Sequence, residues 1–326
     1  MTDGDVCPPK LAIVIHTEEE FDWGGGFNVD ATSVTHGEEL FELVQSLSLI
    51  GAKTTLAMDY PFVNSVQGQR CIANIKASKE ISKKVEFGAH LHPWVNPPFE
   101  KKSGFIPEQL SYPGNLDYQQ ERAKLAELTN IITEQTGTRP VTYLAGRYGI
   151  GNNTQQILNE LEYKIDVSIS PFADYRHQHG PDFRNFNNDI SLENNILSWP
   201  HSSAIVSPFS FVRNYFNSSP TSYSSESLFI KVLKKIFRAK LHRLSPEGFS
   251  LTDMKNLTKF QNTLGQTYFI LSFHSPSVKA GLTPYVKNDR ERGEFIEKIL
   301  SFVNWFEESM NGEFITIDEH PLVRKL

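Results

Sequence analysis

Two short stretches of this 326-residue chain combine imidazoles and carboxylates in a pattern suited to hydrolytic chemistry. In the first, Leu11–Trp23 (LAIVIHTEEEFDW), a buried apolar run ends abruptly in His16, Thr17 and three glutamates. Side chains on a strand alternate with a period of two, so His16 and Glu18 point the same way. An acidic run alone is more often a solvated turn. Three later stretches with the same pattern make a functional site the favoured interpretation of this strand end.

The second stretch carries His90 and His92, which face the same side of a strand end because they are two residues apart. Two imidazoles and one carboxylate form the ligand set of hydrolytic zinc and related divalent sites. An isolated pair of this kind is more often a surface or structural pair. Because Glu18 follows another strand and can supply the third ligand, a metal site is the favoured interpretation, with zinc as the expected ion.

Apolar runs also precede the other polar clusters. Val85–Ala89 leads to the histidine pair, Val141–Ala145 leads to Arg147, and Tyr268–Phe273 leads to His274. If these strands are parallel, their carboxyl ends meet at one edge of the sheet or barrel. We therefore expect the clusters to form one site.

His274 and Arg147 each have a catalytic and a structural interpretation. His274 could protonate a leaving group as a general acid, or could hold the Ser275–Ser277 turn. Arg147 could steady a carboxylate or an oxyanion, or could form an ordinary ion pair.

Aromatic residues stand beside these polar clusters. Trp23, Trp94 and Tyr148 could stack on sugar rings at the mouth of a site, although a core position is the more common fate of a tryptophan.

The composition favours a globular protein. Acidic residues number 38 and basic residues 32, and the net charge of −6 does not suggest a nucleic-acid binder. Cys7 and Cys71, the two cysteines, exclude a disulfide scaffold and a cysteine-based zinc site. No apolar run approaches the ~20 residues that span a membrane, and the first ten residues do not resemble a signal peptide. We expect a soluble, cytoplasmic protein.

Helical and extended patterns alternate along the chain, which predicts an α/β fold with mostly parallel strands. Beyond the strands already named, helices are expected at 36–50, 116–136, 154–162 (with Asn153 as N-cap), 228–244, 251–264 and 289–310, and strands at 52–58, 163–170 and 314–317. One domain, 1–326, is expected. Its core spans about 11–317, and an insertion at about 175–226 contains a short strand near 196–199.

The predicted helix at 228–244 carries six basic residues and no acidic one. A solvated face is the favoured interpretation, and contact with an anion or a membrane surface is the alternative.

The order of these motifs resembles the polysaccharide deacetylase family with NodB homology, carbohydrate esterase family 4, and most closely its WalW-like branch. The motifs are TEEEFDW at 17–23, GAHLHPW at 88–94, AGRYG at 145–149, Asp174, and LSFH at 271–274. The resemblance covers residues 11–317. It implies a distorted (β/α)7-type barrel and metal-dependent removal of an acetyl group from a sugar.

The resemblance also implies roles for single residues. Glu18, His90 and His92 would hold the metal and Arg147 would orient the first motif. Asp174 would be the fourth-motif aspartate of the catalytic set, and His274, in the fifth motif, would protonate the leaving group. Two positions depart from the family pattern. His16 stands where the family has its general-base aspartate, and Trp94 stands where the second metal histidine is usual.

The leading hypothesis is a metal-dependent deacetylase of an N- or O-acetylated saccharide. In it His16, Glu19 or Glu20 serves as the base that activates water. A catalytically inactive saccharide-binding protein and a deacylase of a small amide are the alternatives.

Overall fold

The computed structural model describes residues 8–99 and 103–325. Cys7 and most of the segment compared with signal peptides therefore lie outside the described residues. Within the described residues, no helix is both long enough and apolar enough to cross a membrane.

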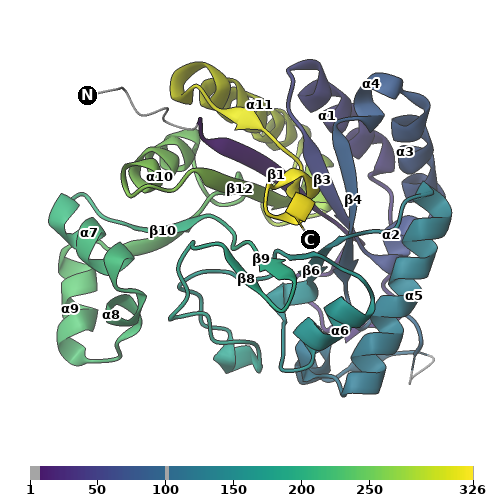
Figure 1. Cartoon of the computed structure of the whole chain (residues 1–326), viewed down its shortest axis with the longest axis horizontal. Helices are drawn as coiled ribbons and strands as arrows, with labels where there is room; N and C mark the ends of the chain where they lie inside the picture. The colour runs from purple at the N-terminus through teal and green to yellow at the C-terminus, as the bar shows by residue number, and fades with distance from the viewer. Residues whose placement is uncertain (1–7, 100–102, 326) are drawn as a thin grey trace.

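A curled, mostly parallel sheet forms the centre of the molecule, as the predicted distorted barrel requires (Figure 1). Its strands follow the order β12-β1-β3-β4-β6-β7-β9-β8, and β13 pairs with β1. The β8–β9 pair is antiparallel. The strands are β1 (Lys10–Thr17), β3 (Thr54–Met58), β4 (Val85–Leu91), β6 (Thr142–Ala145), β7 (Ile165–Asp166), β8 (Ser191–Glu193), β9 (Ile196–Ser198), β12 (Tyr268–His274) and β13 (Glu313–Phe314).

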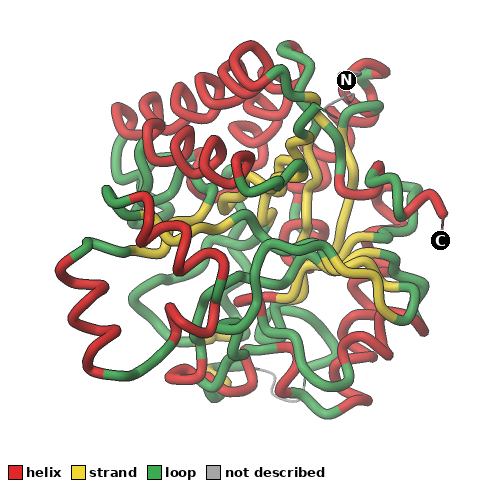
Figure 2. Tube along the Cα trace, turned by 60° about the vertical axis from the view of Figure 1, so that its left-hand side comes forward, coloured by secondary structure: helices red, strands yellow, loops and turns green. Residues whose placement is uncertain are grey.

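Helices cover the outer face of this sheet and supply the crossovers between its parallel strands (Figures 1 and 2). They are α1 (Gly37–Leu49), α2 (Tyr60–Asn64), α3 (Val66–Ala77), α4 (Lys79–Ser82), α5 (Tyr118–Thr136), α6 (Thr154–Glu160), α10 (Leu251–Thr263) and α11 (Asp289–Met310). Two small strands, β2 (Phe27–Asn28) and β5 (Phe105–Ile106), pair beside the main sheet.

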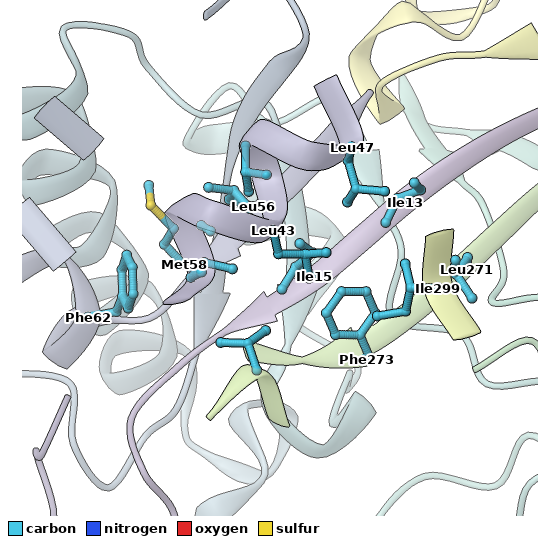
Figure 3. Close-up of a cluster of buried hydrophobic side chains, with 14 of the residues drawn as sticks. Ile13, Ile15, Leu43, Leu47, Leu56, Met58, Phe62, Leu271, Phe273 and Ile299 are labelled. Carbon is cyan, nitrogen blue, oxygen red and sulfur yellow. The ribbon is translucent and has the colours of Figure 1, made fainter. Parts of the chain in front are cut away.

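The alternation of side chains divides the core into two layers. On β1, Ile13 and Ile15 point outward and pack with α1 and α11 (Figure 3). Ala12 and Val14 point inward, into a second and smaller apolar cluster. His16 shares their parity, so the same rule that builds the core directs its imidazole into the barrel.

A separate lobe extends from the sheet and contains part of the predicted insertion (Figures 1 and 2). It comprises β10 (Ser203–Val206), α7 (Ser210–Ser218), α8 (Pro220–Ser224), α9 (Leu228–Ile236) and β11 (Lys240–Arg243). The strand expected near 196–199 is confirmed as β9, which joins the main sheet.

The long helix predicted at 228–244 is wrong in its second half. The helix α9 ends at Ile236, and Arg238 adopts a left-handed conformation with φ of 49°. Residues Lys240–Arg243 then form β11, antiparallel to β10. Pairing with a strand about 35 residues away in sequence overrides the local helical pattern.

Other predicted boundaries shift by a few residues. The helix α5 begins at Tyr118 because Asp117 forms a capping box with Gln120. Asn153 is the N-cap residue of α6, as predicted, although its side chain makes no capping hydrogen bond. The last strand, β13, ends at Phe314, and Ile317 begins a 3₁₀ turn.

A buried carboxyl group lies inside the barrel below the histidines. Glu86 accepts hydrogen bonds from Thr55 Oγ1 at 2.7 Å, from the Asp318 backbone N–H at 3.1 Å, and from Thr142. Burial, together with the charge of Asp318, raises the pKa of Glu86 to about 8. The folded protein therefore keeps a proton on Glu86 that the unfolded chain releases near pH 4.5.

This proton makes stability depend on pH. Because the folded state binds the proton more tightly, its contribution is complete below about pH 4.5 and is lost as the pH rises through about 8. We expect the free energy of unfolding to fall by about 4 kcal/mol over that range, and by less in Glu86→Gln, whose amide does not titrate. Urea unfolding at several pH values measures it. The exposed variant Glu80→Gln is the control, and identical profiles for Glu86→Gln and the parent protein would refute the assignment.

Candidate metal centre and catalytic histidines

Strand register brings the predicted site residues together. His16 pairs with His274 across β1 and β12, and their ring centroids lie 4.7 Å apart. His90, from β4, lies 5.2 Å from His16 between ring centroids. All three imidazoles point into the barrel at the carboxyl ends of parallel strands, where we expected one site.

Glu18 is the meeting point of the histidine pair. Its Oε2 lies 3.2 Å from His90 Nε2 and 3.6 Å from His92 Nε2. All three side chains are buried. The predicted set of one carboxylate and two imidazoles thus converges on a small volume.

The far side of each imidazole is tied by another hydrogen bond. His90 Nδ1 donates to the Leu144 carbonyl oxygen at 3.0 Å, and His92 Nδ1 donates to Glu19 Oε2 at 2.7 Å. Each Nδ1 therefore carries the proton, which leaves a lone pair on each Nε2. Burial also lowers the pKa of both imidazoles, which keeps them neutral near pH 7.

This arrangement fits a divalent ion. Two neutral Nε2 atoms and a carboxylate direct lone pairs at one another, and acceptors need a cation between them. Ligands at about 2.0–2.1 Å from a tetrahedral zinc ion lie roughly 3.4 Å apart. The separations of 3.2 and 3.6 Å agree with that value. The ligand atoms of His16, Glu18 and His90 also lie within 4.8 Å of one another, so His16 borders the same position.

Outer residues fix the orientation of His92. Trp94 Nε1 donates to Glu19 Oε1 at 2.9 Å, and the Trp94 ring stacks on His92 with centroids 4.2 Å apart. Gly146 packs against the other side, where a Cβ would lie 2.6 Å from His92 Cδ2. Such outer contacts set the direction in which a metal-binding imidazole points.

Glu19 and Asp59 form a buried carboxyl pair behind His92. Burial raises the pKa of Glu19 to about 7 and that of Asp59 well above its usual value. Of the two, Glu19 is the acceptor for His92, with Oε2 at 2.7 Å from Nδ1. The ligand atoms of Glu19, Asp59 and His92 also lie within 4.8 Å of one another. Neither carboxyl lines a cavity, and Glu20 instead bonds Ser33 and Thr35.

His16 is a buried neutral imidazole. Burial and the neighbouring histidines, His274 first among them, lower its pKa well below 6.5. Its Nε2 is buried and has no hydrogen-bond partner among the described residues. The ring lines both cavities of the site.

His274 has the opposite electrostatic character. Its Nδ1 lies 2.7 Å from Glu247 Oε2, and its backbone N–H donates to Glu247 Oε1. Although burial disfavours the imidazolium, the carboxylates of Glu247 and Glu18 raise the pKa of His274 to about 9. Two adjacent histidines therefore differ in charge at neutral pH.

Two adjoining cavities open onto these histidines, with volumes of about 380 and 230 Å³. Five residues line both of them: His16, Tyr148, Arg243, His274 and Tyr285. The smaller cavity also contacts Glu18, His90 and His92.

Arg147 lines the smaller cavity but lies apart from the first motif. Its guanidinium donates to Ser111, Gln178 and Glu108 at 2.6, 2.9 and 3.0 Å. It also stacks over Tyr112 at 4.1 Å. Among its hydrogen bonds in the described residues, none reaches His16 or Glu18, which is where the expected orienting role would place one.

Asp174 lies outside both cavities. It is partly exposed and pairs with Arg176 at 2.9 Å and with Arg184 at 3.7 Å. The structure therefore does not bring Asp174 together with the other predicted site residues. The carboxylate that contacts His274 is Glu247.

The three predicted sugar-binding aromatics have different surroundings. Trp94 is 2 % exposed, stacks on His92 and lines the smaller cavity. Trp23 is 42 % exposed and contacts His274 edge-on at 5.4 Å. Tyr148 lines both cavities from a left-handed turn with φ of 59°.

Sequence reasoning missed Glu247, Arg243 and His201. Arg243 lies in the wall of both cavities, and its guanidinium donates a hydrogen bond to Tyr175 Oη at 2.6 Å. His201 packs against His16 with centroids 5.6 Å apart. Arg243 lies within the helix predicted at 228–244 and Glu247 follows that segment, so no strand end marked either residue.

The sequence matches no protein-family model and no characterised protein. Its fold does match solved structures. One from Pseudomonas aeruginosa, described as a "probable polysaccharide deacetylase", has 13 % identity and a TM-score of 0.50 over 95 % of this chain and 88 % of that one. The chitin deacetylase of Colletotrichum lindemuthianum has 11 % identity and a TM-score of 0.44 over 96 % of this chain and 88 % of that one.

The structure of an enzyme with a different activity matches this chain with the same TM-score of 0.50. The 4-alpha-glucanotransferase of Thermococcus litoralis has 9 % identity and a TM-score of 0.50, covering 96 % of this chain and 40 % of that one. Since a hydrolase and a transferase share this fold, function must be argued from the site. The chain therefore shares its fold with the two structures that have a TM-score of 0.50, and its chemistry must be derived from its own histidines and carboxylates.

Proposed function

We propose that this protein is a metal-dependent hydrolase that removes an acetyl group from an N- or O-acetylated saccharide. One observation carries the proposal. The Nε2 atoms of His90 and His92 both face Glu18, while their Nδ1 atoms are held by other acceptors. Such tautomer control is the hallmark of imidazoles that bind a metal.

Glu18, His90 and His92 would hold a divalent ion, with zinc best suited to this ligand set. When bound, such an ion lowers the pKa of a water molecule and polarises an acyl oxygen. The fit of this ligand set supports the metal dependence.

His16 accepts a proton from the attacking water in this proposal. Its neutral state, its unpartnered Nε2 and the position of its ring in the walls of both cavities suit a general base. The proposal does not require Arg147 to orient His16, because a cation next to an imidazole lowers its pKa and so makes it a weaker base.

His274 donates a proton to the departing sugar nitrogen or oxygen. Glu247 holds its Nδ1 and favours the imidazolium, so Nε2–H is the proton available for donation. An adjacent pair whose pKa values are pushed apart is the usual arrangement of a base and an acid. This separation favours catalysis over a silent saccharide-binding role. In the proposal Glu247 takes the place expected for Asp174.

Aromatic side chains support a saccharide as the substrate. Trp23 and Tyr285 stand at the cavity rim with ring centroids 5.6 Å apart, and both are at least 40 % exposed. Exposed aromatic faces of this kind pack well against sugar rings.

Measuring the metal content of single variants distinguishes the residues that bind the metal from the residue that acts as the base. We expect about one equivalent of zinc or another divalent metal per chain, lost in Glu18→Ala and His92→Ala. His16→Ala keeps the metal but loses acetate release from acetylated sugar oligomers by about 10²–10⁴-fold, because only the base is removed. Elemental analysis and an acetate assay measure the two effects.

The exposed variant His177→Ala is the matched control and should behave as the parent protein. Loss of metal from His16→Ala together with its retention in His92→Ala would exchange the two roles. Metal binding without acetate release from any acetylated sugar would refute deacetylation and leave the binding function.

If His274 is the general acid, its pKa determines where kcat/KM falls on the alkaline side of the pH profile. A donor is active while protonated, so kcat/KM should fall as the pH rises through about 9. In Glu247→Gln the carboxylate that raises the pKa of His274 is gone, and the limb should move to lower pH by about one or two units. Titration of the His274 imidazole by NMR provides a readout independent of substrate. An unchanged limb and an unchanged NMR titration in Glu247→Gln would contradict the assignment.

A further inference from the structure

The lobe formed by residues 207–240 exposes an unusual number of large apolar side chains. On α9, Leu228 is 77 %, Phe229 69 % and Ile236 62 % exposed. On α7, Phe211 is 61 % and Tyr215 51 % exposed. We call this set the apolar face of the lobe.

The apolar face is distinct from the side chains that hold the lobe together. On α7, Val212 and Phe216 are buried in the lobe's own small core, one residue along from Phe211 and Tyr215. On α9, Ile230 is buried in that core. Each helix is therefore apolar on two sides, and folding buries only one of them.

Contacts between rings join the two helices at one end of this face. Phe237 directly follows α9, and its ring lies 5.4 Å from Phe211 and 5.3 Å from Phe209. The exposed start of α7 thus adjoins the C-terminal end of α9. In Figures 1 and 2 these helices stand at one end of the molecule, away from the sheet.

Cations accompany the apolar face. Lys231, Lys235, Arg238 and Lys240 are exposed, and none forms an ion pair with a described residue. The segment 227–243 contains no acidic residue, although the whole chain has a net charge of −6. The positive charge is therefore concentrated locally, against the overall balance.

We propose that α7 and α9 form a docking surface for an anionic lipid bilayer. A helix of nine residues is roughly 14 Å long, which suits a helix lying in the plane of the membrane interface. The apolar side chains would enter the boundary between headgroups and acyl chains, and the cations would contact acidic headgroups. A second copy of the chain fits less well, since a symmetric contact would bring like charges together.

The lobe is covalently continuous with the site. The strand β11 follows α9 after three residues, and its Leu241 and Arg243 line the larger cavity. Docking would therefore hold the cavity close to the bilayer. A saccharide carried on a lipid would then be a suitable substrate, a point that rests on the proposed function, whereas docking itself does not.

Vesicle sedimentation tests the docking directly. The purified full chain is mixed with vesicles of phosphatidylcholine alone or of phosphatidylcholine with phosphatidylglycerol. We expect at least about tenfold stronger binding to the anionic vesicles, weakened by salt. The double variants Phe229→Ser/Ile236→Ser and Lys231→Glu/Lys235→Glu should each weaken that binding by about tenfold or more.

Matched controls lie on the other side of the molecule. Val66→Ser removes an equally exposed apolar side chain, and Lys79→Glu/Lys83→Glu reverses two exposed cations with the same spacing. Both should bind as the parent protein does. Metal content and acetate release, measured without vesicles, should remain unchanged in the lobe variants, which separates this proposal from the proposed function.

Two results would overturn the proposal. One is failure to sediment with anionic vesicles, or sedimentation that the lobe variants leave unchanged. The other is self-association, measured by analytical ultracentrifugation, that disappears in Phe229→Ser/Ile236→Ser while vesicle binding is absent, because the occupant would then be a second copy of the chain.

Discussion

The hydrogen bonds that hold the Nδ1 atoms of His90 and His92 are the constraint on which the site depends. A main-chain carbonyl oxygen fixes His90, and Glu19 fixes His92. Both Nε2 lone pairs then face Glu18 in a buried volume, where acceptors without a cation would destabilise the fold. Trp94, stacked on His92, and Gly146, which lets the next loop pack against it, serve this orientation. Strand β4 therefore supplies His90, strand β6 supplies the carbonyl oxygen that orients it, and both contribute to the position that faces Glu18.

The second organising feature is the contrast between His16 and His274. The two residues pair in register on neighbouring strands, so their backbone positions alone would give the two imidazoles similar pKa values. Their partners differ. Glu247 pairs with His274, whereas His16 lies among His90, His201 and His274 without a carboxylate of its own. Burial then favours the neutral state of His16, and the ion pair favours the charged state of His274. Different protonation states are what acid–base catalysis needs from two neighbouring groups.

The sequence predicted those parts of the site that follow simple strand geometry. Apolar runs ending in polar residues marked the ends of β1, β4, β6 and β12, and the period of two placed His16 and Glu18 on one side. The sequence did not predict the elements whose conformation depends on pairing with a distant segment. Residues 240–243 look helical but form a strand with β10, and this pairing carries Arg243 to the cavity. Glu247 comes from the loop that follows, with no local signal of its contact with His274. Arg147 and Asp174 were assigned roles by motif order. Side-chain partners that no local pattern reveals hold Arg147 in the wall of the smaller cavity, away from His16, and hold Asp174 outside both cavities.

The measurement that tests the metal centre most directly is anomalous X-ray diffraction from crystals of the protein grown with zinc. We predict one anomalous peak within bonding distance of Glu18 Oε2, His90 Nε2 and His92 Nε2, with Nδ1 of His92 still bonded to Glu19. A peak between Glu19, Asp59 and His92 instead would move the ion behind the cavity and contradict the proposed roles. No peak, at zinc concentrations that saturate ordinary zinc enzymes, would show that these imidazoles are oriented for another purpose.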